Sequence, residues 1–340
     1  MIVTYIRSSS YGNYDFCQMQ YFMTYVLGYR SESGKKAQLG TACHKVMECL
    51  ASCTKELQDN ADKKELLIID DAIGEVEFTP RKLKTKKFVA DLLSRSYDHY
   101  GSTDSHKYYP ADFKFCEKQI DTALTFNDGQ FDPRKRDIVD TEPTFDIAIE
   151  EDWAKYKYEM PDGTTVEGNL AIKGTIDLVT KIDDNIIEVV DWKTGQRKNW
   201  ATGEVKTYEK LLDDAQLLLY NYAISKLYPD YDQAIMSIFF TRDGGPFSMC
   251  FDKRDQDRFL EMLRKRFEEI KENVKPRPIS YSRRDFRCQK LCHFYKNDWP
   301  GTNTTMCEHV EQRLHTIGHK ETVKECTNEG FNIGYYEAPG

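Results

Sequence analysis

The stretch that most constrains the fold of this 340-residue chain runs from Leu170 to Gly195 and reads LAIKGTIDLVTKIDDNIIEVVDWKTG. Apolar residues alternate with polar ones in its first half and run together in its second half, as in β-strands that are half or fully buried. Between the halves lies Asp183-Asp184-Asn185, a combination typical of turns. The pattern therefore predicts two strands joined as a hairpin.

Three charged residues of this hairpin could form a catalytic group. Successive side chains of a strand point to opposite faces, so Asp191 and Lys193 should share a face while Trp192 points away. Asp177, on the neighbouring strand, can reach the same side. Two carboxylates suit a hard divalent cation, and a lysine beside them can hold a water or neutralise developing negative charge. The alternative is a surface hairpin with ordinary charges.

Asp177, Asp191-x-Lys193 and the following Thr-Gly resemble the core of the PD-(D/E)xK nucleases. The likeness is strongest to the RecB-type branch, which includes phage exonucleases and CRISPR-adaptation nucleases. The resemblance implies an α/β (α+β) fold with a restriction-endonuclease-like core, in which a central mixed sheet is flanked by helices. It also implies hydrolysis of DNA phosphodiester bonds with one or two Mg²⁺ or Mn²⁺ ions.

Two further motifs fit the same branch. Family members carry a metal-binding His four residues after a Gly on an early helix, and His44 follows Gly40 in this way. Glu48 lies one helical turn later on the same face and could support the site from behind. Gln216 and Tyr220 match a Gln and a Tyr four apart, and the resemblance implies that they contact the nucleic-acid backbone or brace the metal site. Core packing is the alternative role for His44 and Tyr220.

The resemblance thus implies a complete set of site residues. The expected metal ligands are, in chain order, His44, Asp177, Asp191 and the backbone carbonyl of Trp192. Lys193 would orient the attacking water and stabilise the transition state, with Gln216 and Tyr220 positioning the DNA strand. Relatives often carry an acid at the start of the first core strand, for which Glu142 is the nearest candidate.

Four cysteines suggest a second metal group. In part of the family, one N-terminal cysteine and three C-terminal cysteines hold a 4Fe–4S cluster that joins the two ends of the chain, and Cys17, Cys288, Cys292 and Cys307 follow this order. Their spacing departs from the usual pattern, with three residues rather than two between Cys288 and Cys292. Four thiolates can bind Zn²⁺ as well. Zinc therefore remains the alternative to iron–sulfur, and His293 or His309 could replace Cys307 as a ligand. Reduced structural cysteines without a metal are a further alternative.

Composition narrows the class of protein. A chain with 40% hydrophobic residues can bury a substantial core. No apolar run approaches the ~20 residues of a membrane span, and the start MIVTYIRSSS lacks the profile of a signal peptide. We therefore expect a cytoplasmic protein without membrane contact, in the host cytoplasm if phage-encoded. The other cysteines should be small core residues: Cys43, Cys49, Cys53, Cys116 and Cys250.

The formal net charge of −8 argues against a surface that is basic overall, but a local basic cleft can still bind DNA. Two segments are candidates for such a cleft. One is residues 81–87, and the other holds Arg283, Arg284 and Arg287 next to Cys288. Either could equally be a solvated charged face.

Hydrophobic periodicity predicts helices at about residues 8–28, 36–57, 84–100, 111–124 and 252–274. Besides the hairpin, it predicts strands at residues 144–150, 153–159, 234–241 and 247–251. Residues 60–80 fit either class. The expected organisation is an N-terminal helical lobe (1–140), a nuclease core (141–275) and a C-terminal cysteine segment with a tail (276–340) that closes on the N-terminus.

The resulting hypothesis is a metal-dependent DNA exonuclease that acts on DNA ends or single strands. It would serve recombination, repair or replication in a phage or bacterium, with a recombination or replication protein as a candidate partner. Three alternatives remain: a catalytically quiet DNA-binding scaffold, a CRISPR spacer-acquisition nuclease, and a zinc-binding interaction protein.

Overall fold

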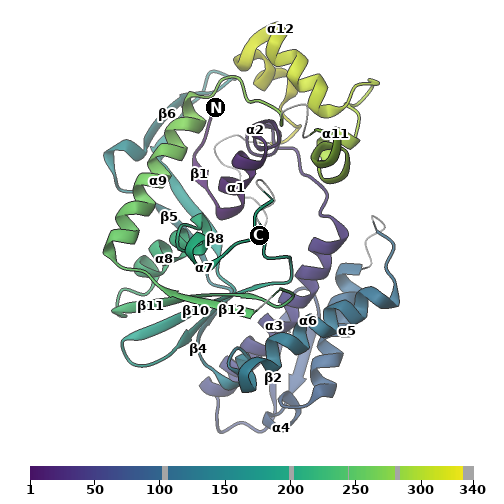
Figure 1. Ribbon diagram of the computed structural model, residues 1–340, viewed down its shortest axis with the longest axis vertical. Helices are drawn as coiled ribbons and strands as arrows, with labels where there is room; N and C mark the ends of the chain where they lie inside the picture. Colours follow the sequence, from purple (N-terminus) through teal and green to yellow (C-terminus); the bar gives the residue numbers. More distant parts are fainter. Residues whose placement is uncertain (102–105, 199–202, 244, 280–283, 332–340) are drawn as a thin grey trace.

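The computed structural model describes residues 1–101, 106–198, 203–243, 245–279 and 284–331. At its centre lies a five-stranded sheet with the order β12-β11-β10-β9-β4 (Figure 1). Its strands are β4 (Asp137–Thr141), β9 (Leu178–Lys181), β10 (Ile186–Lys193), β11 (Gln233–Phe240) and β12 (Gly245–Cys250). The β10–β11 pair is parallel and the other pairs are antiparallel, so the sheet is mixed, as predicted.

Helices cover both faces of this sheet. Along β10, Ile187 and Val189 join one hydrophobic core, whereas Val190 and Trp192 join the other. The first core lies under α8 (Ala215–Leu227) and α9 (Lys253–Glu272). The second lies under the helical lobe, which is made by α3 (Lys35–Asp59), α5 (Lys86–Gly101) and α6 (Pro110–Thr125). Figure 1 shows these two groups of helices on opposite sides of the central strands.

The segment that the sequence left unassigned is a hairpin beside the helical lobe. It consists of β2 (Leu66–Asp70) and β3 (Gly74–Phe78), paired antiparallel, and is followed by α4 (Pro80–Leu83). Asp70 shapes its turn because Oδ1 accepts hydrogen bonds from the N–H groups of Ala72 and Ile73, both at 2.9 Å. The short helices η2 (Phe126–Gly129) and η3 (Pro133–Lys135) lead from the lobe into β4.

A second sheet changes the predicted hairpin. The prediction of one strand from Leu170 to Thr180 is wrong, because β8 (Ala171–Thr175) ends before Asp177 and β9 begins after it. The two strands belong to different sheets: β8 lies between β1 (Tyr5–Ile6) and β5 (Thr144–Ala148), and β9 lies between β10 and β4. The chain crosses from one sheet to the other at Ile176 and Asp177, which places Asp177 in the opening between them.

The remaining strands and short helices surround this frame. They are η4 (Asp152–Ala154), β6 (Lys155–Glu159), β7 (Thr165–Asn169), α7 (Tyr208–Leu212), η5 (Arg284–Leu291), α11 (His293–Lys296) and α12 (Met306–Cys326). β6 and β7 pair as an antiparallel hairpin. β1 and β4 come from the segment 1–140, yet both pair with strands of the segment 141–275.

The N-terminal helix is interrupted where one continuous helix was predicted. α1 (Ser8–Phe16) ends at Cys17, whose φ of −163° and ψ of 111° are extended, and α2 (Gln18–Tyr21) continues into a π-helical turn, η1 (Phe22–Val26). The C-terminal segment meets this region: Met19 N–H donates to Arg277 O at 3.3 Å, and Asn328 N–H donates to Leu27 O at 2.8 Å. Figure 1 shows α12 and α11 beside α2.

All ten cysteines lie in the described residues, and none of them forms a disulfide. Cys43, Cys49, Cys53 and Cys116 are buried, as predicted. The prediction for Cys250 is wrong, because it is exposed on the edge strand β12. In the part of the chain that the structure describes, no helix is both long and apolar enough to cross a membrane.

Candidate active site

A close contact between α3 and the end of β10 sets up the site. A Cβ atom added to Gly40 would lie 2.8 Å from Thr194 Oγ1, which is closer than van der Waals contact allows. Gly40 therefore lets α3 pack directly against the residue that follows Lys193. His44 comes one helical turn later on the same face and points toward Asp177.

His44 and Asp177 form the first half of the site. His44 Nδ1 lies 3.3 Å from Asp177 Oδ2, and the same oxygen accepts the Trp192 N–H at 2.9 Å. Asp177 is thus held from two sides, by the helical lobe and by β10. Because the chain changes sheets at this position, its carboxylate is not part of a regular strand face and can reach α3.

Asp191 and Lys193 form the second half. Lys193 Nζ lies 2.9 Å from Asp191 Oδ1 and 2.8 Å from Oδ2, which confirms that the two side chains share a face of β10. Gln216 Nε2 donates to Asp191 Oδ1 at 3.1 Å. Tyr220 OH accepts from Gln216 Nε2 at 3.0 Å and donates to Thr175 O at 2.9 Å. This network connects β10, α8 and the end of β8.

Two positive groups balance the two carboxylates. Burial lowers the pKa of His44, but the Asp177 carboxylate outweighs this effect and raises the pKa, while His44 holds the pKa of Asp177 below its usual value. Burial raises the pKa of Asp191 in spite of Lys193. Burial also lowers the pKa of Lys193, but the attraction of Asp191 outweighs it and raises the pKa. The charges of the site are therefore paired internally.

The donor set suits a hard divalent cation. Carboxylate oxygens are the ligands that Mg²⁺ and Mn²⁺ prefer, and a neutral imidazole, which suits transition metals, can join them. The buried Asp191 Oδ2 accepts no well-formed hydrogen bond, although Lys193 Nζ lies nearby. This oxygen is therefore available to bind a cation. As the side chains stand, no three His, Cys, Asp or Glu side chains among the described residues converge on one metal position. Ligation would therefore require Lys193 to move off Asp191.

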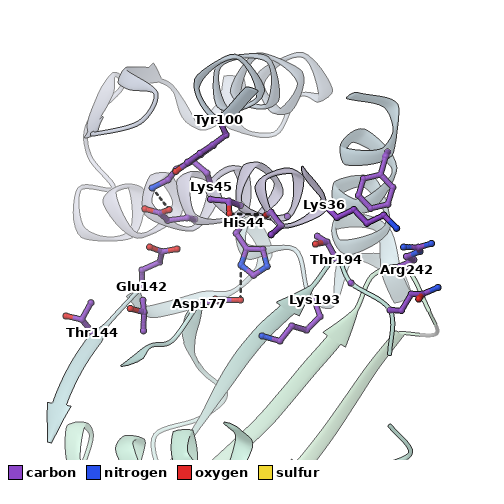
Figure 2. Close-up of a pocket in the computed structure, with 18 residues that line it drawn as sticks. Lys36, His44, Lys45, Tyr100, Glu142, Thr144, Asp177, Lys193, Thr194 and Arg242 are labelled. Carbon is purple, nitrogen blue, oxygen red and sulfur yellow. Dashed lines mark hydrogen bonds and ion pairs between the residues drawn. The ribbon is translucent and has the colours of Figure 1, made fainter. Parts of the chain in front are cut away.

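A cavity of about 760 Å³ opens over this site between the helical lobe and the sheet (Figure 2). His44, Asp177 and Lys193 line it, whereas Asp191, Gln216 and Tyr220 lie behind Lys193. The lining residues that the sequence analysis missed include Lys36, Lys45, Tyr100, Phe115 and Arg242. Lys36 has a sequence signal, since it lies two helical turns before His44 on the same face; Tyr100 and Arg242 have none.

Comparison with known proteins identifies the family of the chain. The family model of the PD-(D/E)XK nuclease superfamily matches residues 8–296, and this range contains each residue of the site. The chain belongs to the PD-(D/E)XK nuclease superfamily. Both the predicted family and the predicted fold are therefore confirmed, and divalent metals such as Mg²⁺ or Mn²⁺ are general in this family.

The comparison with solved structures also gives a match. A crystal structure of a "Putative exonuclease" from Eubacterium rectale is 13% identical, covers 82% of this chain and 85% of its own, and superposes with a TM-score of 0.42. No curated protein matches the sequence.

This PD-(D/E)XK nuclease also carries a group of acids at one end of its cavity. Glu142 lies in the turn between β4 and β5, with a positive φ of 46°, rather than at the start of the first core strand. Its N–H donates to Asp177 O at 3.3 Å. Burial and the nearby Glu48 raise the pKa of Glu142 to about 7. Lys45 Nζ lies 2.5 Å from Glu48 Oε2 and 3.0 Å from Asp70 Oδ2, and it balances part of this charge.

Away from the cavity, the nuclease brings its four predicted cysteines together. Cys17, Cys288, Cys292 and Cys307 line one small void of about 10 Å³ between α2 and the C-terminal segment, with apolar side chains around them. The extended backbone at Cys17 separates α1 from α2 at this position. Four thiolates are a donor set that metal groups use, but in the described residues no three of these sulfur atoms converge on one metal position. The void is about the size of one water, so the thiols would move apart to hold a cluster.

Neither histidine considered as a substitute ligand lines this void. His293 Nδ1 pairs with Asn297 Nδ2 at 3.2 Å, and His309 stacks on Trp299 with ring centroids 4.4 Å apart. In the second basic segment, Arg283 lies outside the described residues, and the guanidinium of Arg287 lies over the Phe16 ring. In the first, Lys84 belongs to a different groove, between α5 and α6.

Proposed function

We propose that this nuclease is a metal-dependent DNA exonuclease that hydrolyses phosphodiester bonds at DNA ends or in single strands. The observation that carries the proposal is the convergence of His44, Asp177 and the Asp191–Lys193 pair at one cavity, from α3, a sheet junction and β10. These residues lie far apart in sequence, and their hydrogen bonds and ion pairs connect them into one continuous group.

In this proposal, His44, Asp177, Asp191 and the Trp192 carbonyl hold one or two Mg²⁺ or Mn²⁺ ions. Such an ion lowers the pKa of a bound water and stabilises negative charge on the phosphate. An imidazole must be neutral to bind a metal, so loading the site would release the proton that Asp177 favours on His44.

Lys193 has the central role among the chain's own groups. Its ammonium lies within 3 Å of Asp191, and its side chain is 32% exposed to the cavity. From this position the ammonium would orient a water toward the phosphate and stabilise the negative charge that develops there. Gln216 and Tyr220 keep Asp191 and the end of β8 in position, and they could contact the strand only after a rearrangement.

Preference for a DNA end is supported by the shape of the site. The cavity lies between the sheet and the helical lobe, and α3, α5 and α6 supply Lys45, Tyr100 and Phe115 to its wall. A wall on this side hinders a duplex from settling across the site but leaves room for the end of a strand. We infer that the helical lobe acts as a gate that admits ends.

We further propose that Cys17, Cys288, Cys292 and Cys307 hold a 4Fe–4S cluster, with Zn²⁺ as the alternative. Their convergence from the two ends of the chain supports this proposal. The cluster would be structural and would fasten the cysteine segment to α2. The biological setting that we propose is recombination, repair or replication in a phage or bacterial cytoplasm, with a protein of that process as partner.

Digestion of linear and covalently closed circular single-stranded DNA tests the proposed activity. With Mg²⁺ or Mn²⁺, an exonuclease should shorten end-labelled linear DNA progressively and leave the circle intact, and EDTA should stop the reaction. Cleavage of the circle at the same rate would contradict the preference for ends. Failure to cleave any substrate with either metal would contradict the proposal as a whole.

A further inference from the structure

The cavity of this nuclease has ends of opposite charge. α3 runs along it and contributes Lys36, Gly40, His44 and Glu48, each one turn after the last and on one face. At 1.5 Å per residue, Lys36 lies about 12 Å along the helix axis from His44, and Glu48 lies about 6 Å away in the other direction. Figure 2 shows the catalytic group between these two ends.

The basic end combines cations from two elements. Lys36 lies in the first turn of α3, and Arg242 follows β11, where the Thr241 N–H donates to Lys193 O at 3.0 Å. Figure 2 shows both side chains at the same end of the cavity, next to Thr194. Neither forms an ion pair with a residue that the structure describes. By contrast, the neighbouring Lys35 pairs with Asp112 at 2.5 Å.

The opposite end is acidic. Glu48, Glu142 and Asp70 gather there, and Lys45 is shared between Glu48 and Asp70. Such a group repels a phosphodiester, whereas the basic end attracts one. The charges therefore favour one direction for a strand that passes through the cavity.

We propose that Lys36 and Arg242 bind a backbone phosphate in the part of the DNA strand that the enzyme retains, so that the strand enters over these residues and its end points toward Glu48 and Glu142. This proposal rests on the proposed function. Lys36 and Arg242 lie at the basic end of the cavity while His44, Asp177 and Lys193 lie between its two ends, so the bound phosphate is a neighbour along the strand of the one that is cleaved. By binding this phosphate, the two cations would fix which linkage of the strand lies at the catalytic group. They would also set the direction in which the strand enters.

A scan with neutral linkages tests this proposal. Single-stranded oligonucleotides with one end label carry one methylphosphonate, which lacks the negative charge, at successive linkages. In the wild type, one neutral linkage on the retained side of the cleaved bond should slow cleavage about tenfold, because it removes the phosphate that Lys36 and Arg242 contact. In the Lys36→Gln/Arg242→Gln variant, that linkage should no longer matter.

The variant should also change binding more than chemistry. We expect a KM about tenfold higher with a kcat near that of the wild type. Each phosphate contact to a single strand contributes about 0.7 to the salt slope. Since the two cations share one phosphate, the slope of log(kcat/KM) against log[salt] should become shallower by about 0.7. Lys84→Gln/Lys86→Gln is the matched control, since it removes two charges from a groove elsewhere on the lobe and should leave the slope and the scan unchanged.

The outcomes separate this proposal from the proposed function. A wild type that cleaves DNA and a Lys36/Arg242 variant that matches it in KM, salt slope and linkage scan would contradict the proposed phosphate site. That result would leave the proposed nuclease function intact. If the sensitive linkage lies in the released part of the strand, the direction of entry is wrong. If the wild type cleaves no DNA at all, the proposed function itself fails.

Discussion

At the scale of single residues, Gly40 shows how one missing side chain can place a catalytic group. A Cβ at this position would lie only 2.8 Å from Thr194 Oγ1, so glycine allows the closest approach of the two segments. The contact brings α3 against β10, and only then does His44 come within 3.3 Å of Asp177. Gly40 thus allows the close packing that the site needs, although glycine has a lower helix propensity than alanine.

Gly40→Ala should reduce cleavage by at least about tenfold, because the added methyl must push α3 away from Thr194 and His44 moves with the helix. The added helix propensity of Ala, up to about 1 kcal/mol, works against any loss of stability. Single-turnover cleavage rates and the urea midpoint measure the two effects separately.

Two further variants control this test. Gly12→Ala in α1 has no atom within 4 Å of the added Cβ and should leave cleavage unchanged. Thr194→Ala removes the atom that clashes, so Gly40→Ala/Thr194→Ala should recover activity relative to Gly40→Ala alone. An active Gly40→Ala variant would show that the contact does not position His44.

The residues of the site were predictable from sequence only where local geometry determines them. Strand alternation was sufficient to place Asp191 and Lys193 on one face and Trp192 on the other. The position of Asp177 at a sheet junction depends on pairing with β1 and β4, which lie more than 30 residues away. Arg242 enters the cavity through the β10–β11 pairing, which no local pattern indicates.

At the scale of elements, the breaks were harder to predict than the elements themselves. The helices α3, α5, α6 and α9 lie within a few residues of their predicted ranges because their apolar spacing is regular. No glycine or proline marks the helix break at Cys17 in the sequence. The break lies where Cys17 meets cysteines that are more than 250 residues away in the chain. Similarly, β8 and β9 read as one strand because apolar alternation continues across Ile176.

The helix α12 contains a partly buried histidine with a consequence for stability. Gly318, with a φ of 79°, breaks the helix, and the His319 ring lies 5.3 Å from the Phe22 ring of η1. Its Nε2 is buried without a hydrogen-bond partner among the described residues, and burial lowers the pKa of His319 to about 4. The folded state therefore keeps His319 neutral at a pH where an unfolded histidine is protonated.

The free energy of unfolding should fall as the pH decreases from about 6.5 toward 4, because the unfolded chain then binds a proton that the folded chain does not. His319 contributes at most about 1.4 kcal/mol per pH unit. Urea titrations at pH 7.5 and 5.5 should show a smaller loss for His319→Gln than for the wild type. His315→Gln, at an exposed position of the same helix, should behave like the wild type; equal losses in all three proteins would contradict this role.

At the scale of the whole molecule, the N-terminal helices and the C-terminal segment up to residue 331 lie together. The C-terminal segment packs on α2 through backbone hydrogen bonds and through the void that the four cysteines line. The order of the cysteines predicted this closure, because the family resemblance implied it. The four cysteines named from their order are the ones that line the void, although their spacing departs from the family pattern.

Cys17→Ser should remove the absorption near 400 nm that thiolate-bound iron clusters give, lower the iron content and lower the thermal midpoint, because one of four ligands is lost. Anaerobically purified protein, its visible spectrum and metal analysis are the measurements. Cys250→Ser changes an exposed cysteine on β12 and should leave all three unchanged. A colourless wild type with one zinc per chain would show that the cysteines bind zinc rather than an iron–sulfur cluster. A wild type without metal would contradict both proposals.

The most direct test of the account is the single-turnover rate of DNA cleavage by Lys193→Ala with Mn²⁺, compared with the wild type. Lys173→Ala removes a partly buried lysine that pairs with Asp146 outside the cavity, and it serves as the control. If Lys193 stabilises charge in the transition state, its loss should slow cleavage by about 100- to 1000-fold, with folding intact by circular dichroism and the control near wild-type activity. Metal-dependent cleavage at the wild-type rate by Lys193→Ala would show that the chemistry does not occur at this site.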